Sequence, residues 1–96
     1  MKNYEIMFIV KPDLEAKAIK DTAESMKKLI TDMKAKSVEM KDLGQKDLAY
    51  EIRDYKTGYY YLINLETDKV EIVKEFDRVA LINENIIRHL IIKMDE

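Results

Sequence analysis

The sequence predicts an α+β domain whose elements follow the order strand, helix, strand, strand, helix, strand. Residues 13–34 and 67–81 repeat apolar side chains at the spacing of amphipathic helices. Residues 4–10, 37–53, 59–66 and 86–94 contain the alternating or continuous apolar runs that are typical of strands. A turn-rich segment, residues 54–58, separates the two middle strands and predicts that they form a hairpin.

Length and composition indicate one folded domain, residues 1–96. With 47% hydrophobic and 38% charged residues, the chain has enough apolar side chains for a core and enough charge for solubility. It contains no cysteine, which excludes disulfides and thiolate metal sites. The apolar runs are shorter than the ~20 residues of a membrane helix, and a strand begins near the first residue. We therefore expect a cytoplasmic protein without a signal peptide.

The first strand and the first helix are defined by their periodicities. In the strand, Phe8 and the other even-numbered residues face the helices, while Glu5, Met7 and Ile9 share the opposite face. Pro12 ends the strand, and Asp13 is the expected N-cap of a helix that runs to about residue 34. The buried stripe expected for this helix is Ile19, Thr22, Ala23, Met26, Leu29, Ile30 and Met33.

The second half of the chain repeats this order. Residues 37–53 form a long, irregular strand in which Gly44 marks a bulge or bend. After the strand at residues 59–66, Asp68 and Glu71 have the spacing of a capping box and predict the start of the second helix. That helix ends near Leu81, and its expected apolar stripe is Val70, Val73, Phe76 and Ala80.

This order of elements predicts a ferredoxin-like split βαβ fold, in which two helices cover one face of a four-stranded antiparallel sheet. Strands one and three should lie in its centre, with the second and fourth strands at its edges. The other face stays open. We expect it to carry Met7, Ile9, Tyr60, Leu62, Leu90 and Ile92. An apolar open face predicts a protein partner, and the alternative is that these side chains stand singly among charged residues and bind nothing.

The sequence offers little for catalysis or for a cofactor. Its single histidine, His89, is expected on the helix-facing side of the last strand as a hydrogen-bonded, partly buried residue. Only two glycines are present, which excludes a glycine-rich phosphate loop. The acidic pairs Asp13/Glu15 and Asp95/Glu96 are better explained as helix-start and terminal charges than as metal ligands. We therefore expect a protein that is not an enzyme and that holds no cofactor and no metal.

The formal net charge of −2 is unusual for a nucleic-acid-binding protein, which normally carries a basic excess. RNA contact therefore requires a local group of cations or a basic partner. Because the first and last strands should be antiparallel neighbours, Lys2 and Lys93 approach each other at one end of the sheet, while Arg88 lies on the open face. Stacking of a base on Tyr60 is less expected than packing of Tyr60 against a protein.

Short motifs are spread along nearly the whole chain. They are Tyr4-Glu5 before an apolar strand and Pro12-Asp13 after it, Leu48-Ala49-Tyr50 with Ile52, Gly58-Tyr59, and the closing Leu81, Asn85, Ile86-Ile87-Arg88-His89-Leu90 and Lys93. Together, in this order and spacing, they resemble the family of bacterial small-subunit ribosomal protein six. Two positions depart from the family pattern: Asp47 replaces a usually basic residue, and Glu51 replaces a frequent proline.

The resemblance implies a structural ribosomal protein that binds the central domain of small-subunit ribosomal RNA as a pair with ribosomal protein eighteen. That partner is strongly basic in the family, which would explain how an acidic chain binds RNA. The resemblance also implies RNA-facing roles for Lys2, Tyr4, Arg88 and Lys93. Two other classes use the same fold. One is a small-molecule-binding regulatory domain. The other is an acylphosphatase-type enzyme. Such an enzyme needs a loop after the first strand that binds an anion, and residues 11–13 do not provide one.

Overall fold

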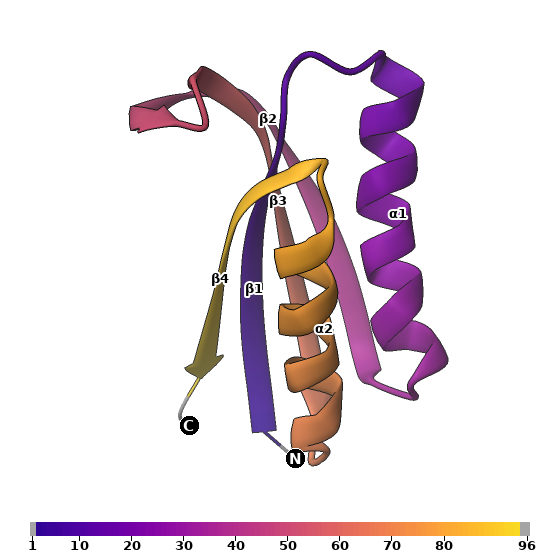
Figure 1. Ribbon diagram of the computed structural model, residues 1–96. Helices are drawn as coiled ribbons and strands as arrows, with labels where there is room; N and C mark the ends of the chain where they lie inside the picture. The colour runs from indigo at the N-terminus through magenta and orange to yellow at the C-terminus, as the bar shows by residue number, and fades with distance from the viewer. Residues whose placement is uncertain (1, 95–96) are drawn as a thin grey trace.

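Six elements follow one another in the predicted order in the computed structural model, which describes residues 2–94 (Figure 1). They are β1 (Lys2–Val10), α1 (Ala16–Asp32), β2 (Lys36–Ile52), β3 (Tyr55–Thr67), α2 (Val70–Ile82) and β4 (Ile86–Met94). The strands form one antiparallel sheet in the order β2-β3-β1-β4. Both helices cover the same face, so the predicted ferredoxin-like fold is confirmed. Asp95 and Glu96 lie outside the described residues.

The core lies between the sheet and the helices, and three aromatic rings form its centre. Phe8 of β1 is fully buried, and its ring stacks on Tyr61 of β3 with 5.5 Å between the centroids. Phe76 of α2 packs against Phe8 at 6.0 Å in a tilted arrangement. Directly paired residues of neighbouring strands share a face, so Phe8 and Tyr61 lie on the same side of the sheet, and the contact of Phe8 with Phe76 shows that this is the side the helices cover. The predicted helix-facing side of β1 is confirmed.

The apolar stripe predicted for the first helix is largely confirmed. Ile19, Thr22, Ala23, Met26 and Ile30 are buried, and Leu29 and Met33 are half-buried. The predicted N-cap is wrong, because α1 begins at Ala16 and Glu15 occupies the cap position without a side-chain hydrogen bond. The carboxylate of Asp13 instead accepts a hydrogen bond from the Tyr55 hydroxyl at 2.9 Å. A contact with the distant hairpin has therefore replaced the expected local cap.

The predicted start of the second helix also needs correction. Lys69 is the N-cap of α2 and makes no side-chain cap, so the capping box of Asp68 and Glu71 is not formed. The hydroxyl of Thr67 accepts a hydrogen bond from the Lys69 N–H at 3.0 Å and turns the chain into the helix. Of the predicted apolar stripe, Phe76 and Ala80 are buried and Val73 is half-buried. Val70 is 44% exposed, and Ile72 takes its place in the core.

The hairpin between β2 and β3 is longer than predicted. Ile52 pairs with Tyr55, so Arg53 and Asp54 form a two-residue turn, and both have positive φ angles of 50° and 68°. These angles match the type I′ turn that suits the twist of a hairpin. Residues 55–58, predicted as turn, belong to β3. The bulge predicted at Gly44 is confirmed by its φ of 81° and by a register shift next to it.

Replacing Phe8 with alanine should lower the free energy of unfolding by about 3–5 kcal/mol, the range for emptying a large aromatic site in a core. Equilibrium denaturation measures this loss. Leu81, which is 64% exposed on α2, offers the control, and Leu81→Ala should stay within about 0.5 kcal/mol of the wild type. A loss below about 1 kcal/mol for Phe8→Ala would contradict the central place of this ring in the core.

Candidate protein and RNA interface

Strand register arranges the open face in rows, each with one residue from every strand. Read from β4 across β1 and β3 to β2, the rows are Arg88, Ile9, Tyr60, Gly44; then Leu90, Met7, Leu62, Lys41; then Ile92, Glu5, Asn64, Glu39. The first two rows are mostly apolar, and the third carries two carboxylates. The open face therefore has an apolar part toward the β2–β3 turn and an acidic part toward the other end.

The six residues predicted to bind a protein are neighbours in these rows. Leu90 and Ile92 are 47% and 42% exposed. Of the other predicted residues, Met7, Tyr60 and Leu62 are half-buried. Ile9 lies on the open face, as predicted, but it is only 3% exposed, so its side chain is not part of the accessible surface. The reason is that part of the β2–β3 hairpin lies over it.

This covering segment arises from an unequal pairing of β2 with β3. The register passes from Asp47↔Thr57 to Ile52↔Tyr55, so four residues of β2 lie opposite one residue of β3. Extra residues on one strand bend it and increase its twist. In Figure 1 the end of the hairpin accordingly turns out of the plane of the sheet and extends toward the β4 side. We name residues 48–52 the overhang.

A pocket of about 130 Å³ lies between the overhang and the sheet. Leu48, Ala49 and Ile52 line it from the overhang, and Met7, Ile9 and Leu90 line it from the sheet. Tyr60, considered above for base stacking, also lines the pocket, and the Lys46 ammonium lies 5.8 Å from its ring centre. Its half-buried ring thus serves as a pocket wall, which agrees with packing against a protein.

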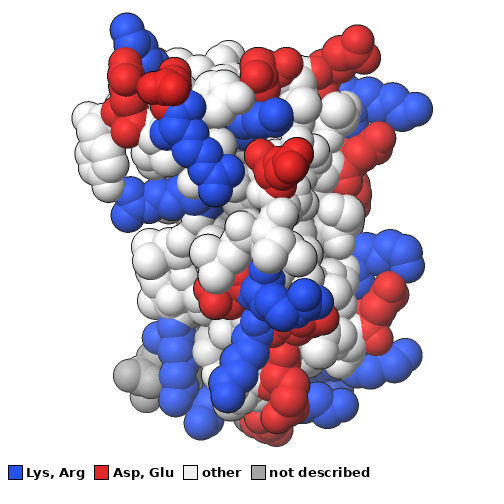
Figure 2. Space-filling model, viewed as in Figure 1, with Lys and Arg blue, Asp and Glu red and all other residues white. Residues whose placement is uncertain are grey.

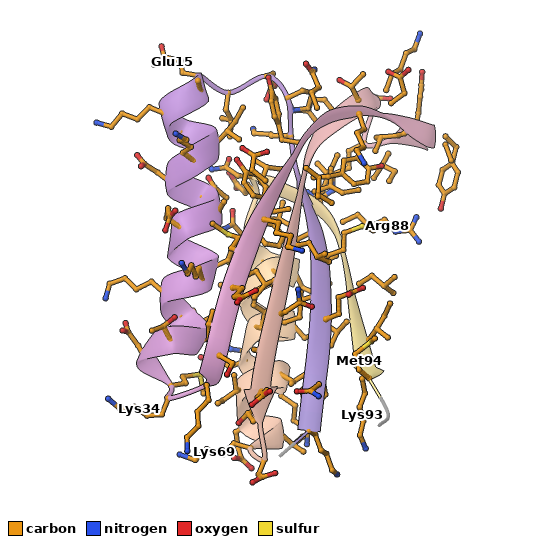
Figure 3. All side chains as sticks on the ribbon, turned by 180° about the vertical axis from the view of Figure 1, so that it is seen from behind. Glu15, Lys34, Lys69, Arg88, Lys93 and Met94 are labelled. Carbon is orange, nitrogen blue, oxygen red and sulfur yellow. The ribbon has the colours of Figure 1, made fainter. Side chains whose placement is uncertain are left out.

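Tyr50 forms another wall of the pocket, and the sequence analysis did not identify it as a site residue. Its side chain is 62% exposed. The guanidinium of Arg88 lies 5.9 Å from the ring centre, and Nη1 donates a hydrogen bond to the Tyr50 hydroxyl. Figure 3 shows Arg88 reaching outward from β4 beneath the end of the hairpin. Regular alternation along the sequence describes a flat strand and gives no sign that Tyr50 lies near Arg88. The contact between these two residues is seen only in the bent strand.

Two further contacts hold the hairpin end in place. The Tyr55 hydroxyl donates to Asp13 as described above, and Nη1 of Arg53 donates to the carbonyl of Ile86 at 3.4 Å. The hydrogen bond to Asp13 raises the pKa of Tyr55 above its ordinary value of 10.0, because an ionised phenol cannot donate and is repelled by the carboxylate. The hairpin end next to the overhang is therefore tied to the loop after β1 and to the start of β4.

The four RNA-facing candidates fall into two groups. Lys2, Tyr4 and Lys93 lie at one end of the sheet, where Tyr4 pairs with Lys93. Tyr4 is only 8% exposed and belongs to the core, so most of its ring faces protein. Arg88 precedes Lys93 by five residues along β4, about 17 Å at roughly 3.3 Å per residue. A single phosphate cannot contact both, and the odd spacing directs them to opposite faces.

His89 is the partly buried, hydrogen-bonded histidine that the sequence predicted. Its side chain is 12% exposed, and Nε2 lies 2.7 Å from Oδ1 of Asp77 on α2. The edge of its ring also contacts Phe76, with 6.4 Å between centroids. These contacts tie β4 to α2. Within residues 2–94, no three His, Cys, Asp or Glu side chains gather in the way that metal ligands do.

Over the described residues, the helix-covered side has no large basic region (Figure 2). Lys, Arg, Asp and Glu are interspersed there, and the pairs Lys28–Asp32 at 2.9 Å and Arg78–Glu75 at 2.6 Å each lie within one helix. Exposed pairs of this kind contribute little beyond helix stability. Of the helices described between residues 2 and 94, neither has the length and apolar character needed to cross a membrane.

Comparison with known proteins gives the family. The family model for ribosomal protein S6 matches residues 3–93. The chain belongs to the ribosomal protein S6 family. The 30S ribosomal protein S6 of Thermotoga maritima superposes with a TM-score of 0.90 and 26% sequence identity, covering 97% of this chain and 87% of that one. An Arabidopsis thaliana protein with 12% identity shares the fold alone, at a TM-score of 0.62 over 100% of this chain and 95% of that one.

S6 family membership makes this chain a ribosomal protein of the small subunit, and the family is a structural rather than an enzymatic one. The predicted family and fold are confirmed. Membership favours the ribosomal prediction over the regulatory-domain and acylphosphatase alternatives.

Gly58 of β3 lies against the Ile9 side chain of β1, and its replacement by alanine should be destabilising. An added Cβ would lie 2.3 Å from Cγ2 of Ile9, so we expect a loss of about 1–3 kcal/mol from overpacking. In an Ile9→Ala background, where that methyl is absent, the same change should cost less. A double-mutant cycle measured by urea denaturation gives the coupling energy.

Gly44→Ala is the matched control for that cycle. Nothing lies within 4 Å of its Cβ position, but its φ is +81°, so its cost comes from the backbone and should be the same in both backgrounds. Equal costs of Gly58→Ala in the wild-type and Ile9→Ala backgrounds would show that the contact between Gly58 and Ile9 does not limit this position.

The Tyr55–Asp13 contact predicts a pH dependence at the alkaline end. The folded-state pKa of Tyr55 is raised above its unfolded value, so its contribution to stability is complete at neutral pH and is lost as the pH rises above 10.0. Asp13→Ala should return this pKa toward 10.0, and NMR of Cζ-labelled tyrosine measures it. Tyr61, whose pKa is raised by burial, should not respond to Asp13→Ala. A Tyr55 pKa that is unchanged in the variant would refute the assigned cause.

Proposed function

We propose that this chain is a non-catalytic structural component of the cytoplasmic small ribosomal subunit that binds the central domain of the subunit's RNA together with ribosomal protein eighteen. The observation that carries the proposal is the division of the open face. An apolar area beside a row of carboxylates is suited to a basic protein, whereas RNA phosphates would be repelled there. RNA contact then belongs to the cations at the margins of the sheet.

The partner contact uses the apolar rows. Leu90 and Ile92 are exposed on an edge strand, and Met7 and Leu62 continue the same surface into the sheet. Burial of such a surface provides the main favourable term of association. The carboxylates of Glu5 and Glu39 lie in the next row, and they supply the charge that a basic partner complements.

The RNA contact divides between two places. Lys2 and Lys93 are exposed at one end of the sheet, and Lys34 and Lys69 lie toward the same end (Figure 3). Arg88 provides a second position near the hairpin. Because the net charge is −2, long-range attraction to RNA is weak, and the partner must supply the rest.

Titration of the intact chain against a central-domain RNA fragment, with and without protein eighteen, tests the proposal. We expect weak binding by the chain alone and a sharp rise in affinity when the partner is present. Equal affinities in the two titrations would remove the role of the partner. Sedimentation of a cell lysate gives an independent check, since a ribosomal protein must move with the small subunit at low salt.

Three variants resolve the contacts within the same titration. Lys93→Ala should reduce the salt slope of RNA binding by about 1. Arg88→Ala should weaken the ternary assembly by about 1–3 kcal/mol while thermal stability changes by no more than about 0.5 kcal/mol. Arg88→Lys should recover only part of that loss because the planar guanidinium is missing. Lys17→Ala, at an exposed position of α1, is the control and should change nothing.

A further inference from the structure

The β2–β3 turn brings a second arginine to the start of β4, and we propose that Arg53 and Arg88 together bind one phosphate group of the RNA backbone. This inference rests on the proposed function, from which it takes the RNA. It deepens that function in two ways. It turns a single cation near the hairpin into a paired phosphate site, and it makes Tyr50 the positioning residue of that site.

The two arginines line one cleft of about 240 Å³, which lies where the hairpin turn meets the end of α2 and the start of β4. Arg53 comes from the turn, Leu81 from α2, and Arg88 and His89 from β4. Among residues 2–94, no aspartate or glutamate lines this cleft. Arg53 and Arg88 are distant in the sequence, so it is the fold that assembles a cationic site from them.

The charges nearest the cleft do not cancel the two arginines. The carboxylate of Asp77 is engaged with His89. Asp54 and Glu84 are exposed and follow the turn and α2 in the sequence, but neither lines the cleft. The C-terminal end of α2 carries a partial charge of about −0.5, which is smaller than the two full charges of the guanidinium groups. The cleft therefore attracts an anion.

Each guanidinium is held by one hydrogen bond that leaves further donors for a ligand. Nη1 of Arg53 donates to the carbonyl of Ile86 at 3.4 Å, and Nη1 of Arg88 donates to the Tyr50 hydroxyl. A guanidinium has five N–H donors in a planar fork, which suits the bidentate recognition of a phosphate. Two such groups in one cleft can contact the oxygens of one phosphate from two directions.

Tyr50 acts through Arg88. Its ring centre lies 5.9 Å from the guanidinium carbon, and its hydroxyl accepts the hydrogen bond described above. An exposed arginine that no neighbour holds loses about 2 kcal/mol of rotamer entropy when it is fixed on a ligand. Because Tyr50 has already restricted Arg88, less of that cost remains when the phosphate binds.

Replacement of Arg53 is the first test, in a titration of the intact chain with protein eighteen against the central-domain RNA fragment. Arg53→Gln should weaken RNA binding about tenfold through the loss of a charge-assisted hydrogen bond, and Arg53→Lys should bind more tightly than Arg53→Gln because it keeps the charge. Arg78→Gln is the matched control and should bind like the wild type, since Arg78 is an exposed arginine of α2 that pairs with Glu75 outside the cleft.

The salt dependence of binding separates one shared phosphate from two independent contacts. The slope of log affinity against log salt concentration counts the phosphates that a protein neutralises. In the double variant Arg53→Gln/Arg88→Gln, this slope should fall by about 1 in total, as for one phosphate. A fall of about 2 would show that the arginines contact different phosphates, which overturns the shared site.

A double-mutant cycle tests the role of Tyr50. Tyr50→Leu should weaken RNA binding several-fold in the wild type and should have no further effect in an Arg88→Gln background. Tyr50→Phe keeps the ring and loses the hydroxyl, so its affinity should lie between those of the wild type and Tyr50→Leu. Equal losses from Tyr50→Leu in both backgrounds would overturn the positioning role. Thermal unfolding of each variant shows whether the fold is intact.

The outcomes separate this inference from the proposed function. If the wild-type chain with protein eighteen does not bind the RNA, the proposed function fails. If it binds and Arg53→Gln binds as well as Arg78→Gln does, the function stands and the phosphate site is overturned. A loss that appears only in the binding of protein eighteen without RNA would identify a carboxylate of that protein as the ligand, and this result also overturns the inference.

Discussion

From Lys36 to Ile52, β2 uses 17 residues, whereas the part of β3 that pairs with it runs only from Tyr55 to Glu66. The longer strand cannot lie flat against the shorter one, so its surplus is released in bulges and a bend. Most of the surplus falls in residues 48–51, next to the turn. The bend carries the hairpin over the open face, and it depends on Gly58, because any Cβ there would collide with Ile9. The pocket, the exposure of Tyr50 and the burial of Ile9 all follow from this mismatch.

The same mismatch in strand length makes the two ends of the open face different. Near the turn, the overhang shields the first apolar row and leaves a shaped pocket. Farther from the turn the sheet is bare, and the row with Glu5 and Glu39 is acidic. On the proposed function, a partner of this face is apolar at one end and cationic at the other, which is a stricter requirement than burial of an apolar patch alone. The pairing of Arg88 with Tyr50 places the cation of the first apolar row at the pocket rim.

Sequence patterns predicted the features that depend on a local period. The buried stripe of α1, the helix-facing side of β1 through Phe8, and the sheet order all follow from helical or alternating spacing together with chain topology. The failures share another cause, because each depends on a distant contact. Asp13 accepts a hydrogen bond from Tyr55 rather than capping α1. The position of the two-residue turn at Arg53 depends on the register shifts along β2, which a short stretch of sequence does not reveal. For the candidate site, alternation found the apolar rows but could not find the overhang, since a bent strand and a flat one have the same period.

The acidic balance of the chain bears on how the assembly forms. On the proposed function, the carboxylates of Glu5 and Glu39 oppose RNA as long as they are bare, because like charges weaken approach over about a Debye length of 8–10 Å. A cationic partner seated on that row neutralises them and adds its own charge, so RNA should bind more tightly to the pair than to either protein alone. Thermodynamic linkage then requires the reverse: RNA must raise the affinity of the two proteins for each other by the same factor. Lys2 and Lys93, at the end of the sheet nearest the acidic row, should benefit most from this neutralisation, whereas Arg88, beside the pocket, should benefit less.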